Sequence, residues 1–246
     1  MTTTVRSDAS GTFGALQVNG TDVLRFGADT SGALAGFRNI LINGEVTRIN
    51  QRAVANWAAV SNGAYGYDRW KKIDASNMTQ IVEAGNFVPS TTYTLSGISV
   101  TTQQLVSPAS GNWTLPNIPI AATYVQLERG SIATPFENRS IGLELSLCQL
   151  YYQKIWPTYF GQASSSTAVR FYAQWLATMR TAPTIVIANG TGIFDEIGVA
   201  VRNLSGLTLT NATINGGLLD GVTAGTTTNN RCAFNGSLPV ELSAEL

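Results

Sequence analysis

The chain has 246 residues, of which 44% are hydrophobic, and its 15 basic side chains balance its 15 acidic ones, giving a formal net charge of zero. Nucleic-acid binding through phosphate neutralisation requires basic patches, and the sequence contains no basic run. Histidine is absent, which removes the usual general base and the commonest zinc ligand. No apolar run approaches the roughly 18 residues of a membrane span. We therefore expect no nucleic-acid partner, no membrane insertion, no metal and no cofactor.

Polar character in this chain comes mainly from uncharged residues. Only 12% of the residues are charged, and Thr, Ser, Asn and Gly supply the remaining polarity. Because Thr fits a pleated sheet and Gly and Asn form turns, this composition favours a β-rich fold. The two cysteines, Cys148 and Cys232, are too few for a disulfide scaffold, and free buried thiols are favoured over a bridge. The first residues lack the pattern of a signal peptide, which favours assembly in a cytoplasm.

Residues 1–37 are predicted to form an extended N-terminal arm with one hairpin. Asn19-Gly20 is the strongest short hairpin signal, and apolar residues flank it. Pairing across a two-residue turn places Leu16 opposite Val23 and puts Leu24 on the other face. A glycine-rich connector follows the hairpin. An isolated hairpin is marginal in water, so the arm is expected to gain its stability from neighbouring copies or from a docking partner. The docking candidates are Leu16, Val18, Val23, Leu24 and Phe26.

Residues 38–140 are predicted to form a first β domain. A turn is expected at Asn43-Gly44. Short strands, each bounded by Gly, Pro, Ser or Asn, are expected at residues 93–100, 103–106, 112–115 and 123–127. Strands this short and regularly punctuated indicate an antiparallel β-sandwich.

Residues 141–154 are predicted to form a connecting helix. Leu143 and Leu147, followed by Leu150 or Tyr151, recur at helical spacing, and Glu144 stands early, as the helix dipole prefers. A strand is the competing interpretation, because apolar residues also alternate from position 141 to position 147. The helix is the favoured of the two.

Residues 155–246 are predicted to form a second β domain. Strands are expected at residues 169–172, 198–201, 206–210 and 238–244. The chain is therefore predicted to be mainly β, with antiparallel sandwich domains of jelly-roll or lectin-like type, one short helix and the arm.

Several motifs are spread over residues 38–246. Val125-Gln126-Leu127-Glu128, Gly130, Ala133-Thr134-Pro135-Phe136-Glu137 and Arg139 are followed by Leu147-Cys148-Gln149 and Tyr151-Tyr152-Gln153-Lys154. Upstream stand Leu41-Ile42-Asn43-Gly44, Gln51-Arg52 and Tyr67-Asp68-Arg69-Trp70, and Ala244-Glu245-Leu246 closes the sequence. These motifs resemble the signature of a family of tailed-bacteriophage tail-fibre and virion-surface proteins. Val169-Arg170-Phe171-Tyr172 and residues 179–187 are similar to lectin-like sandwiches that end many phage fibres.

The resemblance implies a structural protein of a virion, a tail fibre or a head-associated fibre that acts in host attachment. It implies a homotrimer, contacts with tail, portal-proximal or capsid proteins, and a surface glycan of the host as the receptor. About fifty residues separate the DRW and VQLE motifs, which is short for a jelly roll. The first sandwich is therefore either trimmed, or completed by the C-terminal half or by another subunit. The alternatives are a capsid decoration protein and a carbohydrate-binding module of a polysaccharide-degrading enzyme.

No catalytic residue is predicted. Glycoside hydrolysis needs two carboxyl groups facing each other across a cleft. Asp195 and Glu196 are adjacent, so in a strand they point to opposite faces. Glu128 and Glu137 belong to the motifs, where pairing with a neighbouring arginine is the simpler account.

Aromatic residues are the candidates for binding, because the apolar faces of sugars stack on exposed rings. Tyr67, Trp70, Tyr151 and Tyr152 lie inside the motifs and are expected to be core. Four other aromatic residues are the candidates for contact with a glycan or a partner: Trp57, Trp113, Trp156 and Tyr159.

Overall fold

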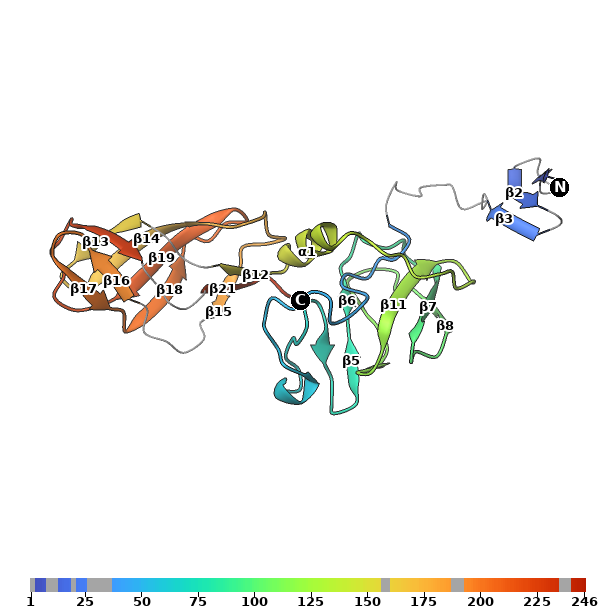
Figure 1. The fold of residues 1–246 in the computed structure, drawn as a ribbon, viewed down its shortest axis with the longest axis horizontal. Coiled ribbons are helices and arrows are strands. Elements are labelled where there is room, and N and C mark those ends of the chain that lie inside the picture. Colours follow the sequence, from blue (N-terminus) through green and yellow to red (C-terminus); the bar gives the residue numbers. More distant parts are fainter. Residues whose placement is uncertain are drawn as a thin grey trace. The chain divides into compact units, whose positions relative to one another are not determined.

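A computed structural model describes residues 3–7, 13–18, 21–25, 37–155, 160–186, 193–234 and 240–246 (Figure 1). Contacts along the chain divide it into two units, Met1–Arg38 and Asn39–Leu246. Strands account for 39% of the residues and helix for 6%, and the strand pairs are antiparallel. The predicted mainly β fold is therefore confirmed.

The first unit contains a three-stranded antiparallel sheet of β1 (Thr3–Ser7), β2 (Phe13–Val18) and β3 (Thr21–Arg25). β2 and β3 pair on either side of Asn19-Gly20, as predicted, whereas β1 was not anticipated. The predicted register is wrong. Leu16 pairs with Leu24 and not with Val23, because the register shifts between Leu16 and Gln17 and leaves Val23 as an extra residue in β3. Phe26 and the predicted connector at 27–36 lie outside the described residues.

Three small antiparallel sheets form the beginning of the second unit. β10-β5-β4 consists of Ile118–Pro119, Asn77–Thr79 and Lys71–Lys72; β11-β7-β8 consists of Thr123–Arg129, Thr92–Ile98 and Gln103–Val106; β6 (Ile81–Val82) pairs with β9 (Trp113–Thr114). A short 3-10 helix, η1, covers Trp57–Ala59. The four strands predicted here are present, with ends shifted by at most a few residues.

These sheets enclose a first core of buried apolar side chains. Aromatic rings pack edge to face within it, with Trp57 against Tyr67 and both Phe87 and Tyr93 against Trp113. The buried members are Leu41, Val46, Trp57, Val60, Tyr67, Trp70, Met78, Val82, Phe87, Tyr93, Leu95, Trp113, Leu115, Ile118, Ala122, Val125 and Leu127.

The predicted helix is present as α1 (Ile141–Gln149), with Ser140 as its N-cap. Its buried face is formed by Glu144 and Cys148, four residues apart, and Leu143 is exposed. The helix ends earlier than residue 154, because the next residues form a strand, β12 (Tyr152–Ile155), which pairs with β21 (Val240–Ser243). The ladder with β21 satisfies backbone groups that a longer helix would have paired internally.

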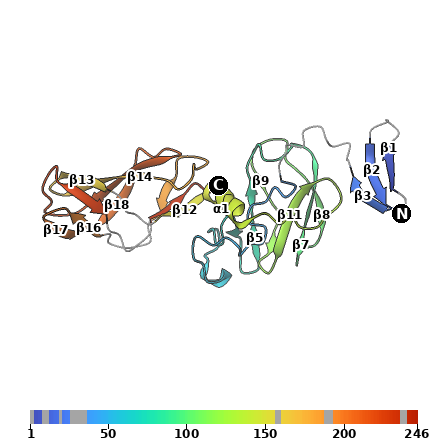
Figure 2. The same cartoon turned by 45° about the horizontal axis from the view of Figure 1, so that its top comes forward.

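Two sheets form the remainder of the second unit. One has the order β12-β21-β15, with β15 at Thr184–Val186. The other has seven strands in the order β17-β16-β20-β13-β14-β19-β18, and Figure 2 shows the labelled strands of this sheet as one group. Its strands are β13 (Phe160–Ser165), β14 (Ala168–Gln174), β16 (Ile193–Glu196), β17 (Ala200–Asn203), β18 (Gly206–Thr210), β19 (Gly216–Val222) and β20 (Arg231–Phe234).

The inner face of the seven-stranded sheet and the smaller sheet share a second core. Along β14 the side chains of Val169, Phe171 and Ala173 are buried, and those between them are exposed. Gly161 permits a close approach of β13 to β14, since a Cβ there would lie 1.9 Å from the carbonyl oxygen of Arg170. The buried members are Ile155, Ala163, Val169, Phe171, Ala173, Trp175, Met179, Phe194, Leu204, Leu219, Cys232, Val240, Leu242 and Ala244.

Candidate functional site

Asn43, in the predicted turn, organises a buried polar centre. Its backbone is left-handed (φ 57°), and its side-chain amide donates to three backbone carbonyls, among them that of Asp68 at 3.1 Å. The backbone carbonyl of Asn43 accepts a hydrogen bond from Trp70 Nε1 at 2.8 Å. The next residue, Gly44, has no room for a side chain, because a Cβ there would lie 2.5 Å from the carbonyl oxygen of Val125. The turn is thereby tied to the DRW motif.

Arg139 and Glu144 complete this centre. The two side chains are 4% and 7% exposed, and they form an ion pair at 3.1 Å. Arg139 also donates to the carbonyls of Asn39 and Leu41, and Glu144 accepts the backbone N–H of Asn43. A carboxylate in the first turn is also favoured by the helix dipole. Hydrogen bonds and an ion pair therefore connect the start of α1 to the segment that begins at Asn39.

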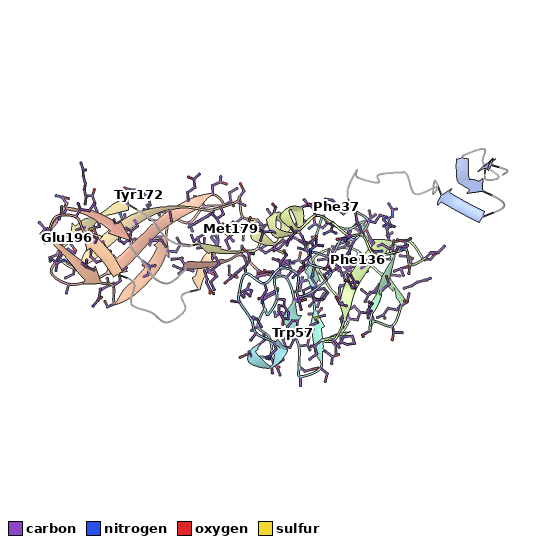
Figure 3. The ribbon with its side chains drawn as sticks, viewed as in Figure 1. Phe37, Trp57, Phe136, Tyr172, Met179 and Glu196 are labelled. Carbon is purple, nitrogen blue, oxygen red and sulfur yellow. The ribbon has the colours of Figure 1, made fainter. Side chains whose placement is uncertain are left out.

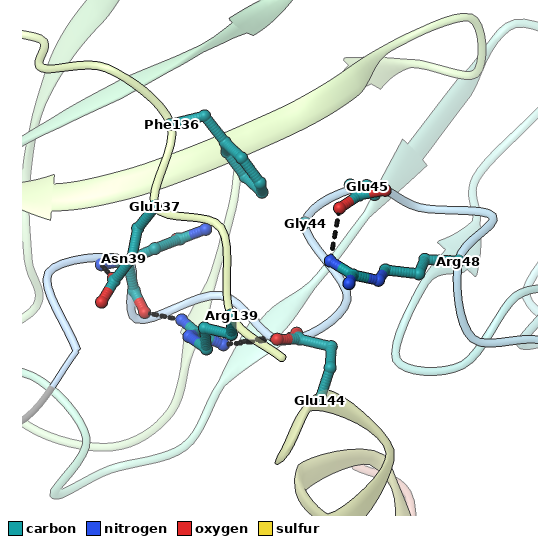
Figure 4. Close-up of a pocket in the computed structure, with 8 residues that line it drawn as sticks. All are labelled: Asn39, Gly44, Glu45, Arg48, Phe136, Glu137, Arg139 and Glu144. Atoms are coloured by element: carbon teal, nitrogen blue, oxygen red, sulfur yellow. Dashed lines mark hydrogen bonds and ion pairs between the residues drawn. The ribbon is translucent and has the colours of Figure 1, made fainter. Parts of the chain in front are cut away.

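A small pocket opens beside this centre (Figure 4). It is lined by Asn39, Gly44, Glu45, Arg48, Phe136, Glu137, Arg139 and Glu144. Its empty volume of about 220 Å³ includes open solvent, and only about 10 Å³ can hold the centre of a water molecule. A single water needs about that much space, so the pocket is too small for a sugar ring.

A second buried polar centre joins motifs that lie far apart in the sequence. The guanidinium of Arg69 lies 3.5 Å from the ring centroid of Tyr151, and that of Arg52 lies 3.7 Å from the ring centroid of Tyr152. Both arginines form ion pairs with Glu245, Arg52 at 3.2 Å. The QR, DRW, YYQK and AEL motifs therefore meet at one place.

Arg180 adds a further link to the second centre. Its guanidinium donates to Glu83 from Nη2 at 2.6 Å and from Nε at 2.9 Å, and the hydrogen bond lowers the pKa of Glu83. The hydroxyl of Tyr151 donates to the same carboxylate at 3.1 Å. Arg180 Nη1 also donates to the carbonyl of Ala244 at 2.9 Å. These contacts fasten the strands of the second core to the loops around the first.

Asp68 is buried beside these arginines. Its Oδ2 accepts the backbone N–H of Gln51 at 2.8 Å, and within the described part of the chain its Oδ1 has no hydrogen-bond partner. Burial disfavours the charged carboxylate and raises the pKa of Asp68 to about 6. A pKa of about 6 places the titration of Asp68 within two pH units of neutrality.

Two of the four aromatic residues predicted to bind a glycan or a partner lie in the described part of the chain, and both are buried. Trp57 and Trp113 are 8% and 7% exposed and pack inside the first core, so neither presents an open ring face. Trp57 is labelled in Figure 3. Trp156 and Tyr159 lie outside the described residues. Among the docking candidates, Leu16 and Val18 lie in β2, and Val23 and Leu24 lie in β3.

Three of the four carboxylates that could be considered for catalysis, Glu128, Glu137 and Glu196, accept hydrogen bonds within the fold. Asp195 is exposed and Glu196 is buried, on opposite faces of β16 as predicted. Glu196 accepts hydrogen bonds from Arg202 Nε and from the backbone N–H of Thr227. Burial acts to raise the pKa of Glu196, but these donors, with the amide of Asn230, outweigh it and lower the pKa to about 2.

The two motif glutamates have side-chain and backbone partners close by. Thr134 donates two hydrogen bonds to the Glu128 carboxylate. Its backbone N–H donates to Oε1 at 2.7 Å, and its hydroxyl donates to Oε2 at 2.6 Å. Glu137 accepts the backbone N–H of Asn39 at 2.6 Å. The arginine of this motif, Arg139, forms its ion pair with Glu144.

A row of exposed apolar side chains crosses the outer face of the seven-stranded sheet, and the sequence reasoning missed it. Phe160 is 73% exposed, Tyr172 is 67% exposed and Val201 is 69% exposed. The alternation Val169-Arg170-Phe171-Tyr172-Ala173 was the available signal, since a strand that buries Phe171 must expose Tyr172. This surface is the candidate functional site of the described residues.

Across the described ranges, no three side chains of His, Cys, Asp or Glu come together as metal ligands would. The described part of the chain also contains no helix with the length and hydropathy to span a bilayer. Comparison with protein-family models, with curated proteins and with solved structures finds no match to this chain.

Proposed function

We propose that the chain is a non-enzymatic structural component of a bacteriophage virion, a homotrimeric tail fibre or head-associated fibre that contacts a host surface glycan. The first unit, Met1–Arg38, docks the chain on other virion proteins, and the second unit projects from the particle. The proposal rests on the motifs that resemble phage fibre proteins and on what those motifs do in the fold.

One observation carries the proposal. Motif residues spread from Asn43 to Glu245 meet in two buried polar centres, where they pair with one another, with Glu144 and with backbone groups. Polar motif residues that bind a ligand would line an accessible surface. The motif residues here are buried instead, and they connect segments that lie far apart in the sequence. A signature of this kind specifies a common framework, and surfaces outside it are free to differ between receptors.

The engagement of the carboxylates supports a protein without catalytic turnover. Glu128, Glu137 and Glu196 each accept hydrogen bonds from backbone N–H groups, which fix them as structural acceptors. A general acid for glycoside hydrolysis needs a raised pKa, and the pKa of Glu196 is lowered instead.

The two alternatives differ from this proposal in an observable way. A capsid decoration protein would have the same framework but would not contact the host cell. A carbohydrate-binding module would bind polysaccharide without being part of a particle.

Competition for host cells tests the proposed function. The purified chain, added before the virus that encodes it, should occupy the receptor and reduce adsorption of the particles. Incubation with host polysaccharide should release no new reducing ends. Unchanged adsorption would contradict the attachment role, and release of oligosaccharides would contradict the assignment as a non-enzyme.

A further inference from the structure

The outer face of the seven-stranded sheet carries one residue from each strand in a continuous row, here called the outer row. Strand pairing aligns Val201 with Asp195, Asp195 with Ala233, Ala233 with Phe160, Tyr172 with Leu218 and Leu218 with Thr210. Phe160 and Tyr172 continue the register set by the pair Gly161 and Phe171. Five of the seven side chains are apolar: Val201, Ala233, Phe160, Tyr172 and Leu218.

The outer row breaks the usual pattern of such sheets. An antiparallel sheet with one face on a core normally presents polar side chains on the other face. Here Phe160, Tyr172 and Val201 are each about two-thirds exposed or more. Figure 3 labels Tyr172 at the periphery of these strands. Ala233, Phe160, Tyr172 and Leu218 are consecutive in the row, whereas Asp195 separates Val201 from them. Single exposed apolar residues need no explanation, but a continuous patch such as these four marks a surface that another molecule covers.

A polar row runs beside the outer row on the same face. It contains Arg231, Gln162, Arg170, Asp220 and Thr208, which strand pairing aligns in that order. Arg170 Nε and Asp220 Oδ1 form an ion pair at 2.6 Å. Together the two rows hold two arginines and two aspartates. The face is thus a mainly apolar strip beside a polar row, with equal numbers of both charges over the two rows, which resembles the core and rim of a protein interface.

We propose that the outer row is buried against further copies of this chain. The number of copies, three, rests on the proposed fibre function, whereas the location of the contact rests on the sheet alone. Equal numbers of both charges allow one copy to face another without net repulsion, and the chain as a whole has zero net charge.

A glycan fits this face less well than a copy of the chain. A sugar site combines one or two rings with several polar groups that bind hydroxyls. Val201, Leu218 and Ala233 offer neither a ring nor a hydrogen-bonding group. Two aromatic side chains, at ~150–250 Å² each, supply ~300–500 Å² of the ~800 Å² per partner in a standard interface. Phe160 and Tyr172 would supply the centre of such an interface and the polar row its rim.

Sedimentation equilibrium of the full chain at micromolar concentration tests the proposal. The wild type should have three times its chain mass of 26.1 kDa. The double variant Phe160→Thr, Tyr172→Thr keeps residues that suit strands and removes both rings. It should weaken association by about 100-fold or more, because central aromatic residues dominate interfaces.

The control variant is Val106→Thr, Ile132→Thr, which changes two exposed apolar residues outside this sheet. It should leave the trimer mass unchanged. Circular dichroism of both variants should match the wild type, which separates lost association from lost folding.

A label reports the contact without weakening it much. Cys148 and Cys232 are buried, so in Tyr172→Cys the new surface thiol can be spin-labelled selectively. Its spectrum should show an immobilised label, whereas a label at Val106→Cys should be mobile.

Three outcomes would overturn the proposal. They are a wild type that remains monomeric, a double variant that stays trimeric with a mobile label at position 172, and a double variant that loses glycan binding while keeping its mass. A monomeric wild type would also contradict the trimeric state in the proposed function, whereas the other two outcomes concern the location of the contact alone; membership of a virion is tested separately.

Discussion

Arg69 and Glu245 form a buried ion pair although they lie 176 positions apart in the sequence. Their side chains are 2% and 5% exposed, and Arg52 pairs with the same carboxylate at 3.2 Å. Arg69 belongs to the loops around the first core, and Glu245 follows the last strand of the second core. The pair therefore couples the two cores, and loss of Glu245 would leave two arginines without their shared acceptor.

Replacing Glu245 with alanine is expected to lower the free energy of unfolding by about 3–5 kcal/mol, because a buried charge without its partner is strongly destabilising. Urea unfolding followed by tryptophan fluorescence measures this change. The control is Glu45→Ala, which removes a partly exposed pair with Arg48 and should cost no more than about 1 kcal/mol. Equal losses in the two variants would show that the buried pair has no special role.

The raised pKa of Asp68 predicts a dependence of stability on pH. Its pKa is about 6 in the folded chain, against an ordinary value of 3.8. Between these values the folded state binds a proton that the unfolded state lacks, so stability falls as the pH rises from about 4 to above 6. The difference amounts to on the order of 2–3 kcal/mol.

Asp68→Asn keeps an acceptor for the N–H of Gln51 and removes the charge. The urea midpoint of this variant should therefore vary less between pH 4 and pH 7 than that of the wild type, and should be higher at pH 7. If both proteins show the same pH dependence, Asp68 does not titrate in this range.

Glu196 is expected to change stability with pH in the opposite direction to Asp68, because its pKa is lowered. Its pKa is lowered to about 2 from an ordinary 4.5, because its hydrogen-bond donors outweigh the effect of burial. The stability that it contributes is fully present above pH 4.5 and is lost as the pH falls toward 2. Glu196→Gln should unfold more readily at neutral pH and lose less stability on acidification. Thermal unfolding at several pH values measures both effects, and a variant that follows the wild-type curve would contradict them.

Both cysteines should be free and unreactive in the folded chain. Cys148 and Cys232 are buried, and burial raises the pKa of each thiol, which disfavours the reactive thiolate. A thiol-reactive chromophore should detect almost no thiol in the native protein and two per chain in denaturant without reductant. Finding none after denaturation would reveal a disulfide.

Deleting residues 1–36 should leave the second unit folded, because the chain divides after Arg38 and both cores lie beyond that point. The shortened chain should unfold at the same urea concentration as the full chain but should not join virus particles. Aggregation of the shortened chain would show that the first unit is needed for folding.

Local signals predicted much of the fold. The Asn19-Gly20 hairpin, the helix that begins at residue 141 and the strand at 103–106 follow from turn chemistry and periodicity. The bulge at Val23 and the early end of α1 did not, because pairing partners decide them. The burial of Trp57 and Trp113 depends on contacts between distant segments, which composition does not encode.

The candidate site was harder to predict than the fold. Tyr172 and Phe160 become neighbours only when β13 and β14 pair, and Val201 joins them through β16 and β20. Arg69 likewise finds Glu245 only in the folded chain. The sequence contained the alternation around Tyr172, but the residues predicted to contact a ligand were Trp57, Trp113, Trp156 and Tyr159.

The most direct test of the account is an electron cryomicroscopy map of purified particles of the virus that encodes the chain, compared with particles that lack it. The account predicts a projecting density with three-fold symmetry that fits three copies of Asn39–Leu246, and its loss from the particles without the chain. Identical maps, with the chain absent from the purified particles by mass spectrometry, would contradict its assignment to the virion.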